Sequence, residues 1–512
     1  METKRIEVMD TTLRDGEQTS GVSFSSSEKL KIAQLLLKEL KVDRIEVASA
    51  RVSKGEFEAV KQICEWASTE GYLNSVEVLS FVDGGVSLDW IKDSGARVQN
   101  LLTKGSMNHL VHQLKKTPAQ HFKEIGSSIK LANSMGIQTN VYLEDWSNGM
   151  KNSPDYVIEF LEFLNEQDLK RVMLPDTLGV LTPHETFKYI GDIRTRFPEM
   201  HIDFHAHNDY DLSVGNVVEA IQAGCDGIHL TINGMGERAG NAPLASSIAV
   251  INDFMPGIDT GINEEALFAV SKLVENFSAF MIPVNKPVVG ANVFTQTAGI
   301  HADGDNKNNL YFNDLMPERF GRKRKYALGK TSGKANIAKN LEELGLVLED
   351  DEVKLVTQRI IELGDKKQTV TQEDLPYIIS DVLDKEVYEE RVKIDSYVLS
   401  HASGLKPSAT IKLNIDGELF ESHAQGDGQY DAFMNALKIV FLDIDKALPK
   451  LIDYAVRIPP GSNSDALCET LITWSTASGS FITRGLDSDQ TVSAIAATQK
   501  MLNTLFQQKK KK

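Results

Sequence analysis

The feature that most constrains the fold is a regular alternation of short strand-like runs with longer amphipathic runs over residues 1–255. Strand character recurs in the runs Arg5–Asp10, Arg44–Ser49, Val76–Val82, Val98–Thr103, Gln138–Leu143, Arg171–Pro175, His201–His205 and Gly227–Ile232. Strands that alternate with helices are joined by crossover connections and lie parallel in one sheet. Eight such units in about 250 residues predict an α/β fold, a TIM (β/α)8 barrel that forms the catalytic domain, with an open doubly wound sheet as the alternative.

The pattern changes twice after the barrel region. Residues 256–390 are predicted to form helical linker subdomains, and their patch from Pro283 to Lys334 is rich in Gly, Asn, Asp and Lys, as is typical of a functional loop. Residues 391–508 contain a strand–strand–strand–helix pattern twice, which predicts a pseudo-symmetric α+β regulatory domain. The terminal run Lys509–Lys512 is expected to be a disordered basic tail.

The composition argues against several classes of protein. The formal net charge of -17 argues against a nucleic-acid partner, because a polyanion is bound by clustered lysine and arginine. No apolar stretch approaches the roughly 20 residues that span a bilayer, so no membrane association is expected. The three cysteines, Cys64, Cys225 and Cys468, lie far apart and indicate no disulfide framework, which favours a cytoplasmic location.

Polar side chains follow several strands at their carboxyl ends, where TIM-barrel enzymes have their active sites. In chain order these side chains are Arg14, Asp15, Glu144, Thr177, His205, His207 and Asn241. Because the carboxyl ends of the strands meet at one rim of a barrel, we expect these charged, imidazole and amide groups to converge there.

The pair His205 and His207 is the most specific of these features. On an extended strand, side chains two residues apart point to the same face, so both imidazoles can reach one ion. Asp15 supplies a carboxylate and Asn241 a neutral oxygen, a ligand set that suits a divalent cation with open positions for water or substrate. Two hydrogen-bonded histidines without a metal are the alternative.

Three further side chains have candidate roles at the same rim. Arg14 stays protonated and offers fixed donors, so it can stabilise negative charge that develops on an oxygen. Its structural alternative is an Arg–Glu pair that braces the barrel mouth. Thr177 can donate its hydroxyl to a substrate carboxylate, and Glu144 can orient a group or relay a proton, unless it is an ordinary surface carboxylate.

Five motifs in this order resemble those of the 2-isopropylmalate, citramalate and homocitrate synthases, a family of DRE-TIM metallolyases. The motifs are Asp10–Gln18 (DTTLRDGEQ), Leu174–Gly179 (LPDTLG), His205–Asp209 (HAHND), Asn233–Asn241 (NGMGERAGN) and Gly299–Gly304 (GIHADG). The resemblance covers nearly the whole chain. Its last third resembles the allosteric domain to which pathway amino acids bind in these enzymes.

The resemblance implies an acyltransferase that condenses acetyl-CoA with a small 2-keto acid and then hydrolyses the thioester. It implies Asp15, His205 and His207 as ligands of a divalent metal (Mg2+, Mn2+ or Zn2+), with Asn241 as a candidate fourth ligand. The metal would hold the keto acid through its carboxylate and keto oxygens and polarise the carbonyl.

Five residues match other functional positions of the family. Arg14 and Glu144 match its catalytic pair, and Thr177 matches a group that contacts the substrate carboxylate. His301 matches a histidine that the neighbouring subunit delivers, with Tyr311 beside it. The resemblance therefore implies an active site shared between the subunits of a homodimer or a higher homo-oligomer, whereas His301 taken alone would be an ordinary loop histidine.

Family members differ chiefly in the pocket that holds the side chain of the keto acid. Leu79, Leu102 and Tyr142 lie near the ends of the third, fourth and fifth strands, where this pocket is expected. They would form a tight apolar wall that suits the methyl group of pyruvate, as in (R)-citramalate synthase of isoleucine biosynthesis. If the three are ordinary barrel core, 2-isopropylmalate synthase of leucine biosynthesis, which uses 2-oxoisovalerate, is the alternative. Homocitrate synthase is disfavoured because no extra basic residue is suited to a second carboxylate.

Two other functions compete with the synthase. A lyase of the same superfamily would run the reverse cleavage, but the long C-terminal domain argues against it. A ligand sensor on a relic barrel is the non-enzymatic alternative, which the complete set of strand-end residues disfavours. For a synthase we expect feedback inhibition through the C-terminal domain by a branched-chain amino acid, isoleucine or leucine.

Overall fold

The computed structural model describes residues 3–305, 310–365, 370–383, 390–457, 468–476 and 479–507. The chain divides into two units, one of Met1–Phe294 with Phe312–Lys323 and one of Thr295–Tyr311 with Arg324–Lys512. The run Lys509–Lys512, for which a disordered tail is predicted, lies outside the described residues.

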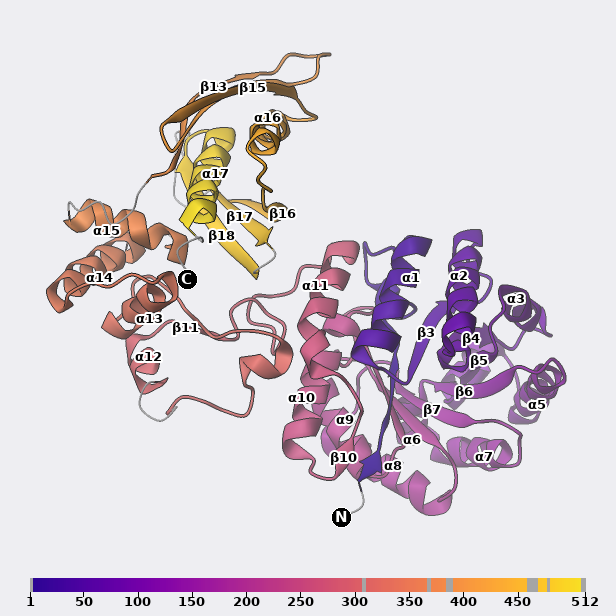
Figure 1. Cartoon of the computed structure of the whole chain (residues 1–512). Coiled ribbons are helices and arrows are strands. Elements are labelled where there is room, and N and C mark those ends of the chain that lie inside the picture. Colours follow the sequence, from indigo (N-terminus) through magenta and orange to yellow (C-terminus); the bar gives the residue numbers. More distant parts are fainter. Residues whose placement is uncertain are drawn as a thin grey trace. The chain divides into compact units, whose positions relative to one another are not determined.

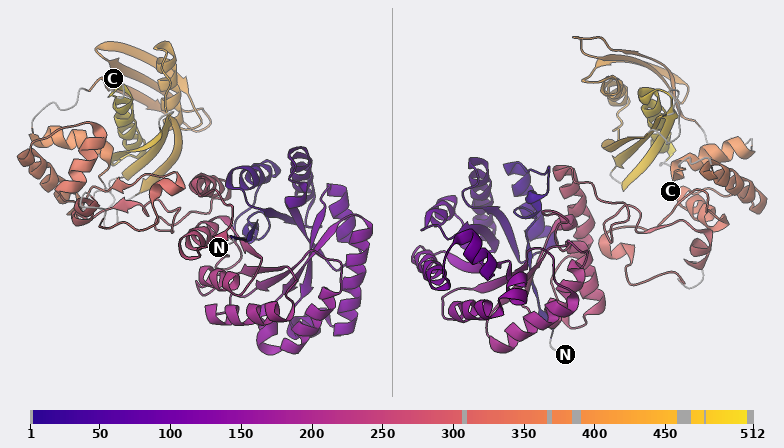
Figure 2. Two further views of the ribbon diagram at one scale, coloured as in Figure 1. Left: turned by 60° about the horizontal axis from the view of Figure 1, so that its bottom comes forward. Right: turned by 180° about the vertical axis from the view of Figure 1, so that it is seen from behind.

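A closed barrel of parallel strands forms the centre of the first unit (Figures 1 and 2). Each strand pairs with its neighbours in chain order, and β2 pairs with β9 to close the ring. The strands are β2 (Glu7–Asp10), β3 (Arg44–Ser49), β4 (Val76–Phe81), β5 (Val98–Lys104), β6 (Gln138–Glu144), β7 (Arg171–Asp176), β8 (Ile202–Ala206) and β9 (Gly227–Leu230). The predicted TIM barrel is thus confirmed, and the open doubly wound sheet is excluded.

Helices surround the barrel, and the left view of Figure 2 shows them outside the strands. The main ones are α1 (Ser26–Gln34), α2 (Lys54–Glu70), α3 (Val86–Ser94), α5 (Pro118–Ser134), α6 (Trp146–Asn152), α7 (Pro154–Asn165), α8 (Pro183–Arg196), α9 (Ser213–Gln222), α10 (Leu244–Phe254) and α11 (Leu267–Ser278). Capping side chains fix the start of several of these helices. At the start of α8, the Thr182 hydroxyl accepts the Glu185 N–H (3.3 Å), and Pro183 is the first helical residue. Among the described helices, none combines the length and hydropathy of a membrane-spanning segment.

The barrel interior contains buried charges at the end where the strands begin. Arg44 of β3 donates to Asp203 of β8 (2.5 Å) and to Glu77 of β4 (3.1 Å). Arg171 of β7 donates to the same Glu77 (3.3 Å) and to Glu7 of β2 (2.8 Å). A layer of branched apolar side chains usually fills this part of a barrel. Here an ion-pair network takes its place, and because it is buried, the loss of either partner would leave an uncompensated charge.

The second unit contains a helical part and an α+β part. The helices of the first part are α12 (Gly299–Asp305), α13 (Lys334–Leu344), α14 (Asp350–Asp365) and α15 (Leu375–Leu383). The α+β part runs β13 (Val392–Ser400), β14 (Ser408–Ile415), β15 (Glu418–Gln425), α16 (Gln429–Asp443), β16 (Lys450–Arg457), β17 (Cys468–Thr476), β18 (Gly479–Asp487) and α17 (Gln490–Gln507). Each repeat is a three-stranded antiparallel sheet followed by a helix, and the two repeats share one hydrophobic core. The predicted C-terminal α+β fold is thus confirmed.

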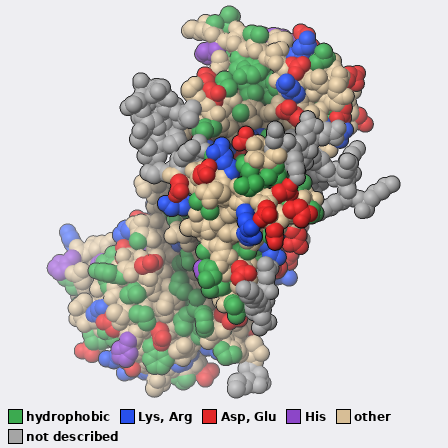
Figure 3. Space-filling view, turned by 90° about the vertical axis from the view of Figure 1, so that its left-hand side faces the viewer, with side chains coloured by type: hydrophobic (Ala, Val, Ile, Leu, Met, Phe, Trp, Pro, Cys, Tyr) green, Lys and Arg blue, Asp and Glu red, His purple; other side chains and the backbone are tan. Residues whose placement is uncertain are grey.

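Charged side chains of both signs lie mixed on the surface. On the face in Figure 3, acidic and basic side chains of the described residues are interspersed with hydrophobic ones. Elsewhere, partly exposed ion pairs include Lys38 with Glu70 (2.6 Å) and Arg51 with Asp83 (2.7 Å). Such pairs contribute little to stability because solvent screens them, in contrast to the buried network inside the barrel.

Candidate active site and metal centre

A tight turn after β2 holds Arg14 and Asp15 at the carboxyl end of the barrel. The carbonyl of Thr11 accepts the N–H groups of Arg14 (3.1 Å) and Asp15 (2.8 Å). The Thr12 hydroxyl accepts the N–H of Ile232 (2.8 Å), which ties the turn to the segment after β9. The first and last strands of the barrel thus fix the position of these two side chains together.

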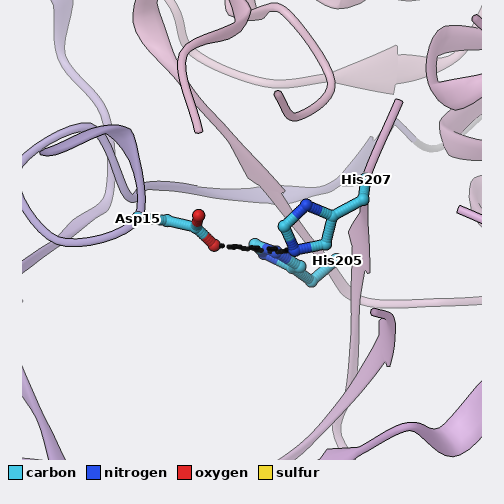
Figure 4. A group of neighbouring side chains, drawn as sticks. All are labelled: Asp15, His205 and His207. Atoms are coloured by element: carbon cyan, nitrogen blue, oxygen red, sulfur yellow. Dashed lines mark hydrogen bonds and ion pairs between the residues drawn. The ribbon is translucent and has the colours of Figure 1, made fainter. Parts of the chain in front are cut away.

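Asp15, His205 and His207 converge at the barrel mouth (Figure 4). The Oδ2 atom of Asp15 lies 3.3 Å from His205 Nε2 and 3.8 Å from His207 Nε2, and the two Nε2 atoms are 3.4 Å apart. The side chains are buried, with exposed fractions of 3%, 3% and 8%. The structure therefore brings together the three side chains that the sequence predicts as metal ligands.

This geometry fits a single divalent cation. A point equidistant from the three facing atoms lies about 2.0 Å from each, the usual distance from Zn2+ or Mg2+ to its ligands. Asp15 Oδ1 and the Nδ1 atoms of His205 and His207 are buried and have no hydrogen-bond partner among the described residues. The distances among the facing atoms fit both one divalent ion and the alternative of a hydrogen bond from His205 Nε2 to Asp15.

The electrostatics of the cluster favour cation binding. Burial opposes ionisation of Asp15, but Arg14 and the two histidines hold the pKa of its carboxyl well below the usual range. Burial lowers the pKa of His207 to about 4, so this imidazole is neutral at neutral pH. An ionised carboxylate and a neutral imidazole are the protonation states that metal ligands need.

Asn241 lies beside His207, with which it forms a β-bridge. Its Nδ2 donates to the Met235 carbonyl (3.0 Å), whereas its Oδ1 is buried and has no partner among the described residues. Gly236 makes this placement possible, because a Cβ there would lie 2.2 Å from Asn241 Nδ2. Asn241 is therefore available as a fourth ligand through its unpartnered oxygen.

Arg14 connects the cluster to a buried carboxylate that the sequence analysis missed. Its Nε donates to Glu46 of β3 (2.5 Å), and its NH1 donates to Asp15 (3.2 Å). Glu46 is fully buried and also accepts from Asn100 Nδ2 (2.7 Å). The Arg–Glu brace considered as an alternative is present, yet it leaves the guanidinium facing Asp15 and 5.9 Å from the ring centre of Tyr142. The available signal was an acidic residue inside the predicted strand Arg44–Ser49.

Glu144 at the end of β6 forms an ion pair with Lys104 at the end of β5. Their side chains are 26% and 10% exposed, so Glu144 is not an ordinary surface carboxylate. Lys104 was not predicted, because a lysine at a strand end is normally solvated. The N–H of Asp145 donates to the Thr177 hydroxyl (2.9 Å), which orients that hydroxyl. Among the described residues, neither Glu144 nor Thr177 makes a hydrogen bond or ion pair with the metal-ligand cluster.

The three residues predicted to line the keto-acid pocket lie in one apolar cluster, which we call the pocket wall. Leu79 and Tyr142 are buried together with Met9 and Met173, and Leu102 packs against them. This cluster is separate from the main core between strands and helices. The Tyr142 ring stands nearly perpendicular to the His205 ring, with 6.2 Å between the ring centroids. The pocket wall therefore lies inside the barrel beside the candidate metal centre, a position that fits both a substrate pocket and barrel core.

His301 and Tyr311 lie together in the second unit. Their ring centroids are 4.3 Å apart. Gly304 permits this contact, because a Cβ there would lie 2.4 Å from the Tyr311 ring. His301 is partly exposed and Tyr311 is 43% exposed, so both rings are accessible on this unit. The two residues expected to act side by side are thus neighbours.

Comparison with known proteins identifies relatives along the whole chain. Family models match at residues 5–274 (HMGL-like), 288–368 (homocitrate synthase post-HMGL domain-like) and 369–506 (LeuA allosteric, dimerisation, domain). The putative (R)-citramalate synthase CimA of Archaeoglobus fulgidus is 33% identical over 98% of this chain and 100% of its own length. The (R)-citramalate synthase CimA of Methanocaldococcus jannaschii is 33% identical over 98% and 99%, and the 2-isopropylmalate synthase of that organism is 31% identical over 99% and 96%.

Asp15→Asn should weaken Mn2+ binding by at least about tenfold, because a neutral amide of the same shape replaces the anionic ligand. The bound fraction can be measured from the electron paramagnetic resonance signal of free Mn2+. Asp209→Asn is the matched control, since Asp209 pairs with Arg238 (2.8 Å) and is not one of the three groups at the candidate metal position. Equal Mn2+ affinity of the wild type and the Asp15 variant would remove Asp15 from the ligand set.

Proposed function

The chain belongs to the HMGL-like family, among the citramalate and 2-isopropylmalate synthases, and we propose that pyruvate is the keto acid that it condenses with acetyl-CoA. It is an acyltransferase: the methyl carbon of the acetyl group bonds to the keto carbon, and hydrolysis of the thioester releases CoA. The product would be citramalate, a precursor in isoleucine biosynthesis. The observation that carries the choice of pyruvate is the pocket wall of Leu79, Leu102 and Tyr142 beside the candidate metal centre.

We assign Asp15, His205 and His207 to one divalent cation, Mg2+, Mn2+ or Zn2+, with Asn241 as a fourth ligand. The mutual distances of 3.3 to 3.8 Å and the unpartnered oxygen of Asn241 support this assignment. A cation held by these residues would supply Lewis-acid polarisation of the keto carbonyl.

Arg14 is assigned to the negative charge that develops on the keto oxygen. Burial disfavours the charged guanidinium, but Glu46 and Asp15 raise its pKa above the usual range, so Arg14 stays protonated. Glu46 occupies Nε, which leaves N–H groups at the far end of the guanidinium for the substrate. Thr177, whose hydroxyl oxygen accepts the N–H of Asp145, keeps its own proton to donate to the substrate carboxylate.

The proton of the acetyl-CoA methyl group must be removed before the carbon–carbon bond forms. We assign the relay of this proton to Glu144, which Lys104 holds at the rim. His301 and Tyr311 would complete the site from the neighbouring subunit, a role that their close ring contact and their exposure support. The dimerisation domain that matches residues 369–506 agrees with a homodimer.

Size exclusion is the physical basis for the choice of pyruvate. Each extra buried CH2 stabilises a bound ligand by about 0.8 kcal/mol, so affinity alone would favour the larger 2-oxoisovalerate. A pocket selective for pyruvate must therefore reject the isopropyl group by steric clash, which packed leucine and tyrosine side chains provide. 2-Isopropylmalate synthase activity is the second candidate, because a relative of that name is 31% identical over 99% of this chain.

The wild type should release free CoA faster with pyruvate than with 2-oxoisovalerate. Leu102→Ala removes part of the pocket wall, so it should shift the ratio of the two kcat/KM values toward 2-oxoisovalerate by at least about tenfold. CoA release is followed with a thiol reagent in the presence of Mg2+ or Mn2+. Leu101→Ala is the control, since the fully buried Leu101 belongs to the main core between the strands and the helices. Its truncation should lower the stability of the protein without changing the ratio of the two kcat/KM values. Faster turnover of 2-oxoisovalerate by the wild type would assign the second activity, and no CoA release with either keto acid would reject both.

A shared active site predicts complementation between inactive subunits. Co-expressed Asp15→Asn and His301→Asn chains, purified as mixed dimers by two tags, should regain about half of the wild-type activity, because one of two sites is then intact. Mixed dimers of Asp15→Asn and Glu144→Gln carry both changes in the barrel and should stay inactive. Failure of the first pair to regain activity would place His301 in the site of its own subunit, or outside any site.

We propose that the α+β part of the second unit binds a branched-chain amino acid, isoleucine or leucine, that inhibits the enzyme. The match to an allosteric domain at residues 369–506 supports regulation through this region. We also propose a cytoplasmic location, because the three cysteines are buried and unpaired, as is usual in a reducing compartment.

Removal of the chain from residue 390 onward should abolish inhibition by isoleucine or leucine, because the effector site is lost with the domain. Initial rates of CoA release are measured over a range of effector concentrations for the full-length and the truncated enzyme. Thermal unfolding of the truncated protein controls for a barrel that is no longer folded. Inhibition that persists unchanged in a folded, active truncation would mean that the effector binds elsewhere.

A further inference from the structure

A fully buried histidine, His229 of β9, has no part in the chemistry proposed so far. It lies between the pocket wall and the ion-pair network of the barrel interior. Its Nδ1 is 3.1 Å from the Tyr142 hydroxyl, and its Nε2 is 3.1 Å from Asp203 Oδ2. The path from Tyr142 through His229 to Asp203 is thus a continuous chain of hydrogen bonds.

Asp203 determines the direction of these bonds. Arg44 donates to the Asp203 carboxylate at 2.5 Å and forms a buried ion pair with it. An ionised carboxylate only accepts, so His229 Nε2 donates to Asp203, and Nδ1 of the neutral ring is left as an acceptor. The Tyr142 hydroxyl must therefore donate to His229.

This bond holds the Tyr142 ring at its far end, while β6 holds it at its near end. The rings of Tyr142 and His229 are nearly perpendicular, at 82°, with centroids 5.6 Å apart. The other neighbours of the phenol ring include Met9 and Met173, whose flexible side chains would tolerate a tilt of the ring. The hydrogen bond is a directional constraint that these apolar contacts cannot replace.

We propose that His229 is a specificity-determining positioning residue, which holds the Tyr142 ring in the pocket wall and so limits the size of the keto-acid side chain that fits. This inference rests on the proposed function in that Tyr142 lines the keto-acid pocket. Asp203, which is ion-paired with Arg44, accepts a hydrogen bond from His229 Nε2 and so fixes the position of the imidazole. The buried ion pairs at the amino end of the barrel thereby act on substrate choice at its carboxyl end, without contact with the substrate.

Three variants separate this role from general support of the fold. Tyr142→Phe removes the hydroxyl and leaves the contact of His229 with Asp203 intact. His229→Gln keeps a donor within reach of Asp203 but no acceptor at the position of Nδ1. His229→Asn does the reverse, since its amide oxygen can replace Nδ1 for Tyr142 but its side chain is too short to reach Asp203. The readout is the ratio of the kcat/KM values for pyruvate and for the larger keto acids 2-oxobutyrate and 2-oxoisovalerate.

Tyr142→Phe and His229→Gln should each lower the preference for pyruvate over 2-oxobutyrate by about fivefold, as for the loss of one buried hydrogen bond. The double variant should lower it no further, because both changes break the same bond, and His229→Asn should have the smallest effect. Ratios equal to that of the wild type in all folded variants would overturn the proposal, even if kcat fell for every keto acid. If the His229 variants do not fold, Tyr142→Phe alone decides.

The same measurements keep the two proposals distinguishable. The preference of the wild type itself tests pyruvate as the substrate. The change of the ratio from wild type to variant tests His229, whichever keto acid the wild type prefers. A wild type that prefers 2-oxoisovalerate but whose ratio shifts in Tyr142→Phe and His229→Gln would contradict the first proposal and support the second.

Discussion

At the carboxyl end of the barrel, a carboxylate oxygen of Asp15 and the Nε2 atoms of His205 and His207 face one another at 3.3 to 3.8 Å. Lone pairs this close repel unless a cation or an imidazole N–H lies between them. The low pKa values of Asp15 and His207 keep the carboxylate ionised and this imidazole neutral, the protonation states that metal ligands need. A divalent ion satisfies all three atoms at once. The roles proposed for Arg14 and the pocket wall depend on that ion, because both act on a keto acid that it holds.

The closed barrel is what allows this convergence. Asp15 follows β2, the two histidines belong to β8 and its end, and β9 lies between these strands and pairs with both. The barrel interior is divided in function along its axis. The polar groups of the candidate site gather at the carboxyl end, and ion pairs around Arg44 and Asp203 fill the amino end. His229 contacts Tyr142 near the carboxyl end and Asp203 near the amino end. The buried ion-pair network therefore contributes to the proposed substrate specificity as well as to the fold.

The barrel and the convergence of Asp15, His205 and His207 could be predicted from the sequence. The barrel leaves an alternation of strand and helix, and the three side chains follow predicted strands at their carboxyl ends. Glu46, Lys104 and His229 could not be predicted in this way. Each is a polar residue in or at the end of a strand, and its partners lie 26 to 87 residues away. Only the closed barrel brings these partners together, so their roles become visible only in three dimensions.

Anomalous diffraction from crystals of the full chain grown with Mn2+ tests the central claim most directly. We predict one strong manganese peak within about 2.3 Å of Asp15 Oδ2 and of the Nε2 atoms of His205 and His207. No peak at this position in crystals of an enzyme that requires Mn2+ for activity, or a peak held by other side chains, would contradict the account.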